Sequence, residues 1–132
     1  EAADVLCFGG GDEQYLAKVM RESGVAAALP ELLKTRVYLG LSAGSMEVGR
    51  LLPSELTHEL WPEESFAGDE AGLGILDLSI LPHLNSDYFS HLRSLGPRFP
   101  TTVYALDDTS AVQVVGSRFR VVTEGVFLTL EK

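Results

Sequence analysis

The sequence contains one cysteine in 132 residues, which excludes a disulfide within the chain. A single cysteine fits a reducing compartment, so we expect a cytoplasmic protein. Cys7 lies in the apolar run Val5-Leu6-Cys7-Phe8, where we expect a buried and unreactive thiol. The three histidines, His58, His83 and His91, show no zinc-ligand spacing together with this cysteine. We therefore expect no metal site.

Basic residues are also few. The sequence has ten lysines and arginines and nineteen acidic residues, which gives a net charge of −9. This charge argues against nucleic acid and against an anionic membrane surface as partners. No apolar run reaches the roughly 18 residues of a membrane-spanning helix, and Glu1-Ala2-Ala3-Asp4 lacks the basic start of a secretory signal. The length and the hydrophobic fraction of 45% predict one small globular domain over residues 1–132.

Apolar runs and turn signals alternate along the chain and predict an α/β fold. The expected strands are Ala3–Phe8, Arg36–Leu41, Leu76–Leu81, Thr102–Leu106, Ala111–Val115, Phe119–Thr123 and Val126–Leu130. The expected helices are Asp12–Ser23, Val25–Lys34, Asn85–Leu95 and a short helix after residue 42. The strand–helix–strand order predicts a parallel sheet, and Gly116-Ser117 predicts a hairpin turn. From Leu51 to Gly74 periodicity fades, which predicts a long functional loop.

The most informative segment is the Gly-x-Ser-x-Gly motif at residues 40–44, between an apolar strand and the start of a helix. A strand, a tight turn and a helix in this order are typical of a nucleophile elbow. Such a turn strains the serine, and Gly40 and Gly44 remove Cβ atoms that would crowd the backbone. We infer that Ser42 is a nucleophile. The alternative is a glycine-rich turn whose serine only caps the helix.

A serine nucleophile also needs a base and donors for the oxyanion. His83 directly follows the expected strand Leu76–Leu81, so in a parallel sheet it emerges at the same carboxyl edge as Ser42. It is the best base, and a loop or helix-capping histidine is the alternative. The N–H groups of Gly9-Gly10-Gly11 can approach a substrate closely, and together with that of Ala43 they predict an oxyanion hole. A phosphate-binding turn is the alternative at the glycines.

In combination, these motifs resemble peptidase E, in the aspartyl dipeptidase and cyanophycinase family of serine peptidases. The resemblance rests on a strand ending in Gly-Gly-Gly-Asp, then Gly-x-Ser-Ala-Gly, then Pro-His after a strand, and on the late strand end Tyr104–Asp108. It implies a three-layer, mostly parallel sheet with flanking helices, like class I glutamine amidotransferases, and a C-terminal β-hairpin. It also implies Ser42 as the nucleophile, His83 as the base, Gly10 and Ala43 as oxyanion donors, and no cofactor.

The resemblance places the acid of the triad in the loop after the elbow helix. Glu59 is our first choice there, with Glu47, Glu55 and Asp69 as rivals. For Glu59 the alternative is a solvated loop carboxylate with no catalytic role.

The resemblance further implies an arginine that holds the aspartate carboxylate of the substrate. Arg93 and Arg98 lie in the corresponding region, although neither matches position for position. A guanidinium group can hold a carboxylate bidentately, so both are candidate substrate-binding residues together with Gly11. We expect a serine peptidase that cleaves small peptides, such as di- or tripeptides with an N-terminal aspartate. The alternatives are a non-catalytic ligand-binding module and an esterase that uses the same elbow.

Members of this family carry one or two further βα units before the Gly-Gly-Gly strand, and this sequence shows none. The apolar strand Val5–Phe8 would then lie at an edge that invites pairing with another chain. We therefore expect a homodimer or larger homo-oligomer that associates through the N-terminal region.

Overall fold

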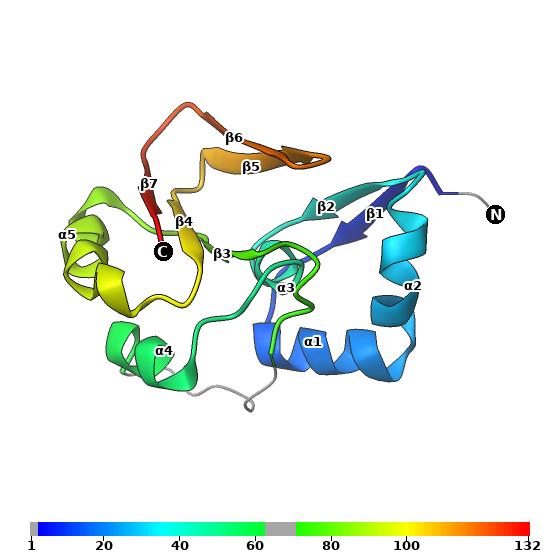
Figure 1. Cartoon of the computed structure of the whole chain (residues 1–132), viewed down its shortest axis with the longest axis horizontal. Helices are drawn as coiled ribbons and strands as arrows, with labels where there is room; N and C mark the ends of the chain where they lie inside the picture. Colours follow the sequence, from blue (N-terminus) through cyan, green and yellow to red (C-terminus); the bar gives the residue numbers. More distant parts are fainter. Residues whose placement is uncertain (1–2, 63–70) are drawn as a thin grey trace. The chain divides into compact units, whose positions relative to one another are not determined.

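The structure, a computed structural model, describes residues 3–62 and 71–132. The chain divides into two compact units, Glu1–Asp77 and Leu78–Lys132, each with its own strands and helices (Figure 1). The expectation of one domain over residues 1–132 stays a prediction. Among the described residues, no helix has the length and apolar character needed to cross a membrane.

Two parallel strands form the sheet of the first unit. These are β1 (Val5–Phe8) and β2 (Val37–Gly40), whose register pairs Val5 with Val37 and Phe8 with Gly40. The connection between them contains α1 (Glu13–Glu22) and α2 (Val25–Leu32), which confirms the predicted strand–helix–strand unit. The Asp12 side chain accepts a hydrogen bond from the Tyr15 N–H at 2.7 Å and so caps α1.

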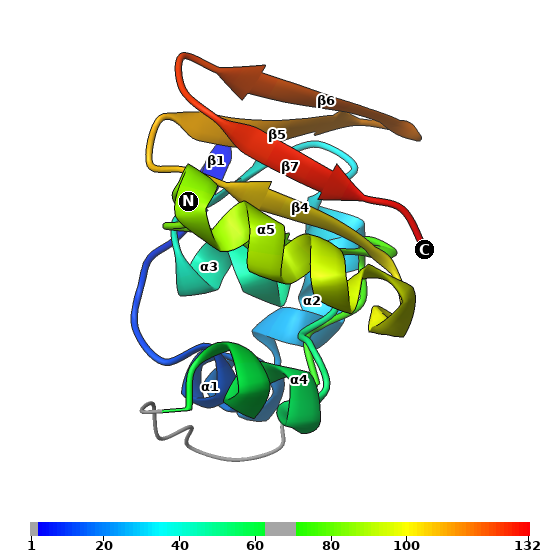
Figure 2. The same cartoon turned by 90° about the vertical axis from the view of Figure 1, so that its left-hand side faces the viewer.

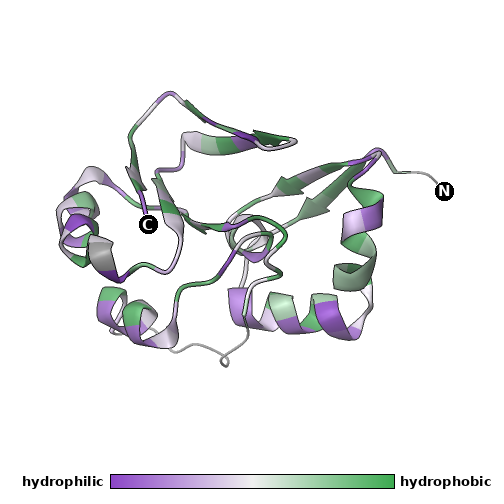
Figure 3. Cartoon of the chain, in the orientation of Figure 1, coloured by the Kyte–Doolittle hydropathy of each residue, from purple (hydrophilic) through white to green (hydrophobic). Residues whose placement is uncertain are grey.

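One face of the β1–β2 sheet is exposed, although both strands are strongly hydrophobic (Figure 3). Alternate side chains of a strand point to opposite faces, and this face carries Val5, Cys7, Val37 and Leu39. The prediction of a buried Cys7 is therefore wrong, since this cysteine is exposed. An apolar run shows that a strand is hydrophobic, but it does not show how many of its faces are covered.

Two short helices follow in the described part of the first unit. The elbow helix α3 (Ala43–Glu47) packs against β1, β2 and α1. The other helix, α4 (Ser54–Leu60), corrects the prediction of a long loop from Leu51 to Gly74, of which residues 63–70 lie outside the described residues. Burial of Leu56 and Leu60, four residues apart on one helical face, accounts for the helix. A single apolar pair over seven residues is too short a pattern to stand out in the sequence.

The second unit contains a mixed sheet and an antiparallel pair. Here β3 (Leu78–Leu81) pairs parallel to β4 (Thr102–Leu106), which pairs antiparallel to β7 (Phe127–Leu130). Strands β5 (Ser110–Val115) and β6 (Arg118–Thr123) pair antiparallel across Gly116-Ser117 (Figure 2). Between β3 and β4 the chain forms α5 (Ser86–Leu95) and the short 3₁₀ helix η1 (Gly96–Arg98).

The core of the second unit lies between α5 and the mixed sheet. Asn85 caps the N-terminus of α5, because its side chain accepts hydrogen bonds from the N–H groups of Asp87 and Tyr88 at 3.1 and 3.4 Å. The buried apolar side chains of this unit are Leu78, Ile80, Leu81, Leu84, Phe89, Leu92, Leu95, Phe99, Val103, Ala105, Leu106 and Leu128. This core fixes the ends of β3 and β4, beyond which His83 and Asp108 follow.

Candidate active site

Ser42 occupies the tight turn between β2 and α3 in a strained backbone conformation. Its φ is 54° and its ψ is −121°. Among the described residues, the non-glycine residues with positive φ are Ser42 and His83. A positive φ costs free energy in a residue with a side chain, and such strain concentrates at functional sites. The two residues that the sequence singles out as nucleophile and base are thus the two strained ones.

The glycines of the motif are required by close backbone packing. A Cβ atom on Gly40 would lie 2.6 Å from the carbonyl carbon of Gly44 and 2.7 Å from the nitrogen of Ser45. A Cβ atom on Gly44 would lie 2.6 Å from the carbonyl carbon of Phe8. Contacts between carbon atoms are ordinarily about 3.5–4.0 Å. The prediction that both glycines relieve crowding at the elbow is confirmed.

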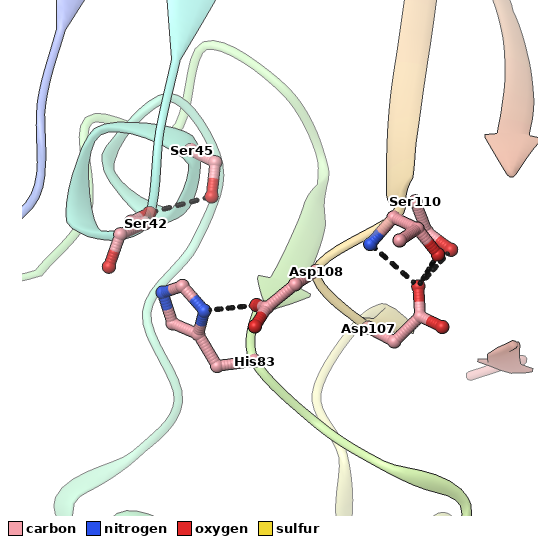
Figure 4. A network of polar contacts seen from close by, with 7 residues as sticks. Ser42, Ser45, His83, Asp107, Asp108 and Ser110 are labelled. Atoms are coloured by element: carbon pink, nitrogen blue, oxygen red, sulfur yellow. Dashed lines mark hydrogen bonds and ion pairs between the residues drawn. The ribbon is translucent and has the colours of Figure 1, made fainter. Parts of the chain in front are cut away.

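The hydrogen bonds that hold the elbow backbone do not involve the Ser42 hydroxyl. The Ser42 side chain makes no capping hydrogen bond to α3, so the interpretation as a mere cap finds no support. Instead, the Ser45 hydroxyl donates to the Ser42 carbonyl at 2.6 Å (Figure 4). The Tyr38 hydroxyl donates to the Gly44 carbonyl at 2.6 Å, and its ring stacks on Phe8 with centroids 4.8 Å apart. The backbone is thus fixed while the Ser42 Oγ is not used for this purpose.

Tyr38 keeps its proton for this hydrogen bond over the whole neutral range. Burial raises the pKa of the Tyr38 hydroxyl well above its usual value, and the nearby charge of Glu47 raises it further. The Glu47 side chain lies in α3 and is fully buried. The strand residue Tyr38 therefore acts as a permanent hydrogen-bond donor to the elbow helix.

The glycine loop after β1 lies beside the candidate nucleophile. A Cβ atom on Gly10 would be 3.3 Å from the Ser42 Cβ and 3.6 Å from its Oγ. The parallel pairing of β1 and β2 explains this proximity, because both strands end at the same edge. The Gly44 N–H also donates to the Gly9 carbonyl at 2.9 Å and ties the loop to the elbow. Within residues 3–62 and 71–132, no backbone carbonyl accepts from the N–H of Gly10 or Ala43.

The second unit carries a histidine–carboxylate pair. His83 follows β3 with φ 65°, and its Nδ1 lies 2.5 Å from the Asp108 Oδ1 (Figure 4). An ionised carboxylate only accepts hydrogen bonds, so the neutral ring carries its proton on Nδ1 and a lone pair on Nε2. The parallel register pairs Leu81 with Ala105, and His83 and Asp108 therefore leave β3 and β4 at the same edge. In this tautomer Nε2 can accept a proton, as a general base must.

Asp108 is a candidate site residue that the sequence analysis does not name as the acid. The resemblance implies an acid in the loop after the elbow helix instead. The available signal was Asp107-Asp108 at the end of the predicted strand Thr102–Leu106, the strand that follows the one ending at His83. Two carboxylates at that position predict a partner for a histidine at the same sheet edge.

The other acid candidates lie in the first unit or outside the described residues. Glu55 and Glu59 are exposed on α4, and Glu47 is buried in α3. Asp69 lies outside the described residues. A catalytic role for Glu59 stays a prediction.

The predicted substrate-binding residues come from both units. Arg93 is exposed in the last turn of α5 and Arg98 is exposed in η1, in the second unit. Gly11 follows Gly10 in the first unit and has φ 129°, a conformation that favours glycine. Their substrate-binding roles stay predictions. In the described part of the chain, no three His, Cys, Asp or Glu side chains are grouped so that they could hold a metal ion.

Serine hydrolases use a strained serine in an elbow as the nucleophile and a histidine hydrogen-bonded to a carboxylate as the base. Peptidase family S51 matches residues 1–122, and the chain belongs to this family of peptidases. The resemblance to peptidase E is thereby confirmed. Among curated proteins, none matches this sequence.

Solved structures of two bacterial proteins share the fold. A candidate peptidase E from Listeria monocytogenes EGD-e superimposes with a TM-score of 0.66 at 18% identity, over 91% of this chain and 59% of that one. A peptidase from an acI-B1 Actinobacterium superimposes with a TM-score of 0.68 at 20% identity, over 98% of this chain and 54% of that one. The chain thus spans less than two thirds of the length of either protein.

Proposed function

We propose that this protein is a serine peptidase that hydrolyses small peptides, such as di- or tripeptides with an N-terminal aspartate. The observation that carries the proposal is the elbow, where Ser42 is strained, makes no capping hydrogen bond and lies beside Gly10. Membership in peptidase family S51 supports cleavage of a peptide bond as the reaction. The peptidase E resemblance alone supports the preference for aspartate.

In the proposed mechanism, the Ser42 Oγ attacks the carbonyl carbon of the peptide bond while the Nε2 of His83 takes its proton. The N–H groups of Gly10 and Ala43 donate to the oxyanion of the tetrahedral intermediate. His83 then returns the proton to the leaving amine as the peptide bond breaks. In the second half, His83 deprotonates a water molecule, which attacks the acyl ester. The ester bond then breaks, the proton on His83 passes to the Ser42 Oγ, and the acid product leaves.

We propose Asp108, rather than Glu59, as the acid that orients His83. The support is the hydrogen bond of 2.5 Å between Nδ1 of His83 and Oδ1 of Asp108. The proposal predicts that Asp108→Asn lowers kcat by about 10⁴-fold, since an amide no longer fixes the required tautomer. Glu59→Gln is the matched control and should leave kcat near the wild-type value. The reverse pattern would assign the acid to Glu59.

We also propose that the two units form one domain, with a three-layer, mostly parallel sheet similar to class I glutamine amidotransferases and β5–β6 as its C-terminal hairpin. The parallel pairs β1–β2 and β3–β4 and the similarity to the two bacterial structures support this arrangement. We further propose a homodimer or larger homo-oligomer in the cytoplasm. The exposed apolar face formed by Val5, Cys7, Val37 and Leu39 supports the self-association.

Hydrolysis of aspartyl dipeptides by the wild type and by Ser42→Ala tests the proposed function. Ser42→Ala should lower turnover by about 10⁶-fold while the fold is kept, because only one oxygen is removed. Ser90→Ala removes the same atom from an exposed position on α5 and is the control. Near-wild-type hydrolysis by Ser42→Ala would contradict the proposal. Hydrolysis of esters but not of peptides would indicate the esterase, and ligand binding without hydrolysis would indicate the binding module.

A further inference from the structure

The Asp107 carboxylate is surrounded by hydrogen-bond donors. Its Oδ1 accepts from the Ser110 hydroxyl at 2.6 Å and from the N–H and hydroxyl of Thr109 at 3.0 and 3.1 Å. Its Oδ2 accepts from the Val126 N–H at 2.6 Å. One carboxylate therefore joins the turn after β4 to the segment that enters β7.

The surroundings of Asp107 leave little freedom for this carboxylate. A Cβ atom on Gly125 would overlap the Asp107 carboxylate, so the approach of the two segments requires glycine there. The Ser110 hydroxyl is also 2.6 Å from the Thr123 hydroxyl, which in turn accepts from the Gly125 N–H at 2.9 Å. The hydrogen bonds from Ser110, Val126 and Thr109 hold the pKa of Asp107 at about 2, so it stays an anionic acceptor at neutral pH.

Asp108 lies between Asp107 and Thr109, the two residues that the hydrogen bonds of the Asp107 carboxylate hold in place. Its side chain is 75% exposed and that of His83 is 60% exposed, so packing does not hold the pair together. Asp107 on one side is anchored by its own carboxylate, and Thr109 on the other side is anchored by its N–H. The backbone on both flanks of Asp108 is therefore held, and the direction of its side chain follows from that backbone (Figure 4).

We propose that Asp107 is a positioning residue, whose carboxylate fixes the backbone on both sides of Asp108 and so directs the Asp108 carboxylate to Nδ1 of His83. This inference rests on the proposed function, in which His83 is the base and Asp108 its acid. A purely structural role of Asp107, which would only join β7 to the turn after β4, makes a different prediction. It would change stability without changing the state of His83.

The Nδ1 proton of His83 distinguishes these two roles. In the full chain labelled with ¹⁵N-histidine, we expect an Nδ1–H signal that His83→Gln removes and that Asp108→Asn removes or shifts. Asp107→Asn should weaken or shift the same signal and lower kcat between about 10- and 100-fold, with KM changed less than about 2-fold. Val103→Ala is the control, because it removes buried apolar contacts from the same strand β4 without touching the turn. It should lower the melting temperature and leave the signal as in the wild type.

Each outcome supports or overturns the proposal. A folded Asp107→Asn with a wild-type signal overturns it. If Asp107→Asn does not fold, Ser110→Ala removes one donor and should give a smaller change of the same kind, and an unchanged signal there overturns the proposal. If Asp108→Asn leaves both the signal and turnover unchanged, the proposed acid fails and the inference fails with it. If Asp108→Asn is defective and neither turn variant is, the inference fails alone.

Discussion

Gly44→Ala adds one methyl group at the most crowded point of the elbow. The new Cβ would lie 2.6 Å from the Phe8 carbonyl carbon and 2.9 Å from the Phe8 Cβ. Ordinary carbon contacts begin at about 3.5 Å, and the Phe8 carbonyl oxygen is closer still, so the backbone must move by at least roughly 0.9 Å. Gly44 also donates to the Gly9 carbonyl at 2.9 Å and accepts from Tyr38 at 2.6 Å, and such a movement stretches both hydrogen bonds.

The free-energy cost follows from these contacts. Overpacking of a filled site costs about 1–3 kcal/mol, and each strained hydrogen bond adds up to about 1 kcal/mol. We expect the free energy of unfolding to fall by about 3 kcal/mol, which lowers the melting temperature by roughly 10 °C. A displacement of the Ser42 hydroxyl approaching 1 Å should lower kcat/KM about 100-fold.

Thermal unfolding and peptide hydrolysis measure the two effects separately. Gly96→Ala is the matched control, because the φ of Gly96 is −41° and nothing lies within 4 Å of its added Cβ. This control should stay within about 0.5 kcal/mol of the wild type and keep full activity. A Gly44→Ala protein with the melting temperature and turnover of the wild type would refute the steric account of the elbow.

Three further predictions concern stability and assembly. Tyr38→Phe leaves the Gly44 carbonyl without its donor and should cost about 1–2 kcal/mol of unfolding free energy, whereas the exposed Tyr15→Phe should cost almost nothing in the same urea titration. The pKa of Asp107 is lowered from 3.8 to about 2, so its contribution to stability is complete above pH 4 and is lost as the pH falls towards 2. Urea unfolding between pH 2 and 5 should therefore show a smaller loss of stability in Asp107→Asn, and equal slopes would contradict this. Sedimentation velocity at micromolar concentration should show a dimer or larger species, and an active monomer of 14.3 kDa would exclude self-association.

The elbow could be predicted from the sequence because its constraints are local. Gly40 and Gly44 are needed by contacts within a few residues of Ser42 and with the strand β1. His83 could be predicted because it directly follows a strand, and the caps Asp12 and Asn85 mark helix starts by their own chemistry. These features depend on short stretches of chain that the sequence displays directly.

The parts that the sequence did not reveal depend on contacts between distant segments. The bond between His83 and Asp108 spans 25 residues and exists because β3 and β4 are parallel neighbours. The exposure of Cys7 depends on which face of a two-stranded sheet the helices cover. The helix α4 depends on the burial of Leu56 and Leu60. Seven residues are too short for this apolar pattern to predict a helix.

Covalent labelling with a fluorophosphonate tests most directly the central claim that Ser42 is a nucleophile activated by His83. Intact mass and peptide mapping should show one adduct per chain, located on Ser42 and absent from Ser42→Ala. His83→Gln should slow the labelling at least about 100-fold, because a general base contributes that much or more. An unmodified wild type, or equal labelling of Ser42→Ala at another residue, would contradict the account.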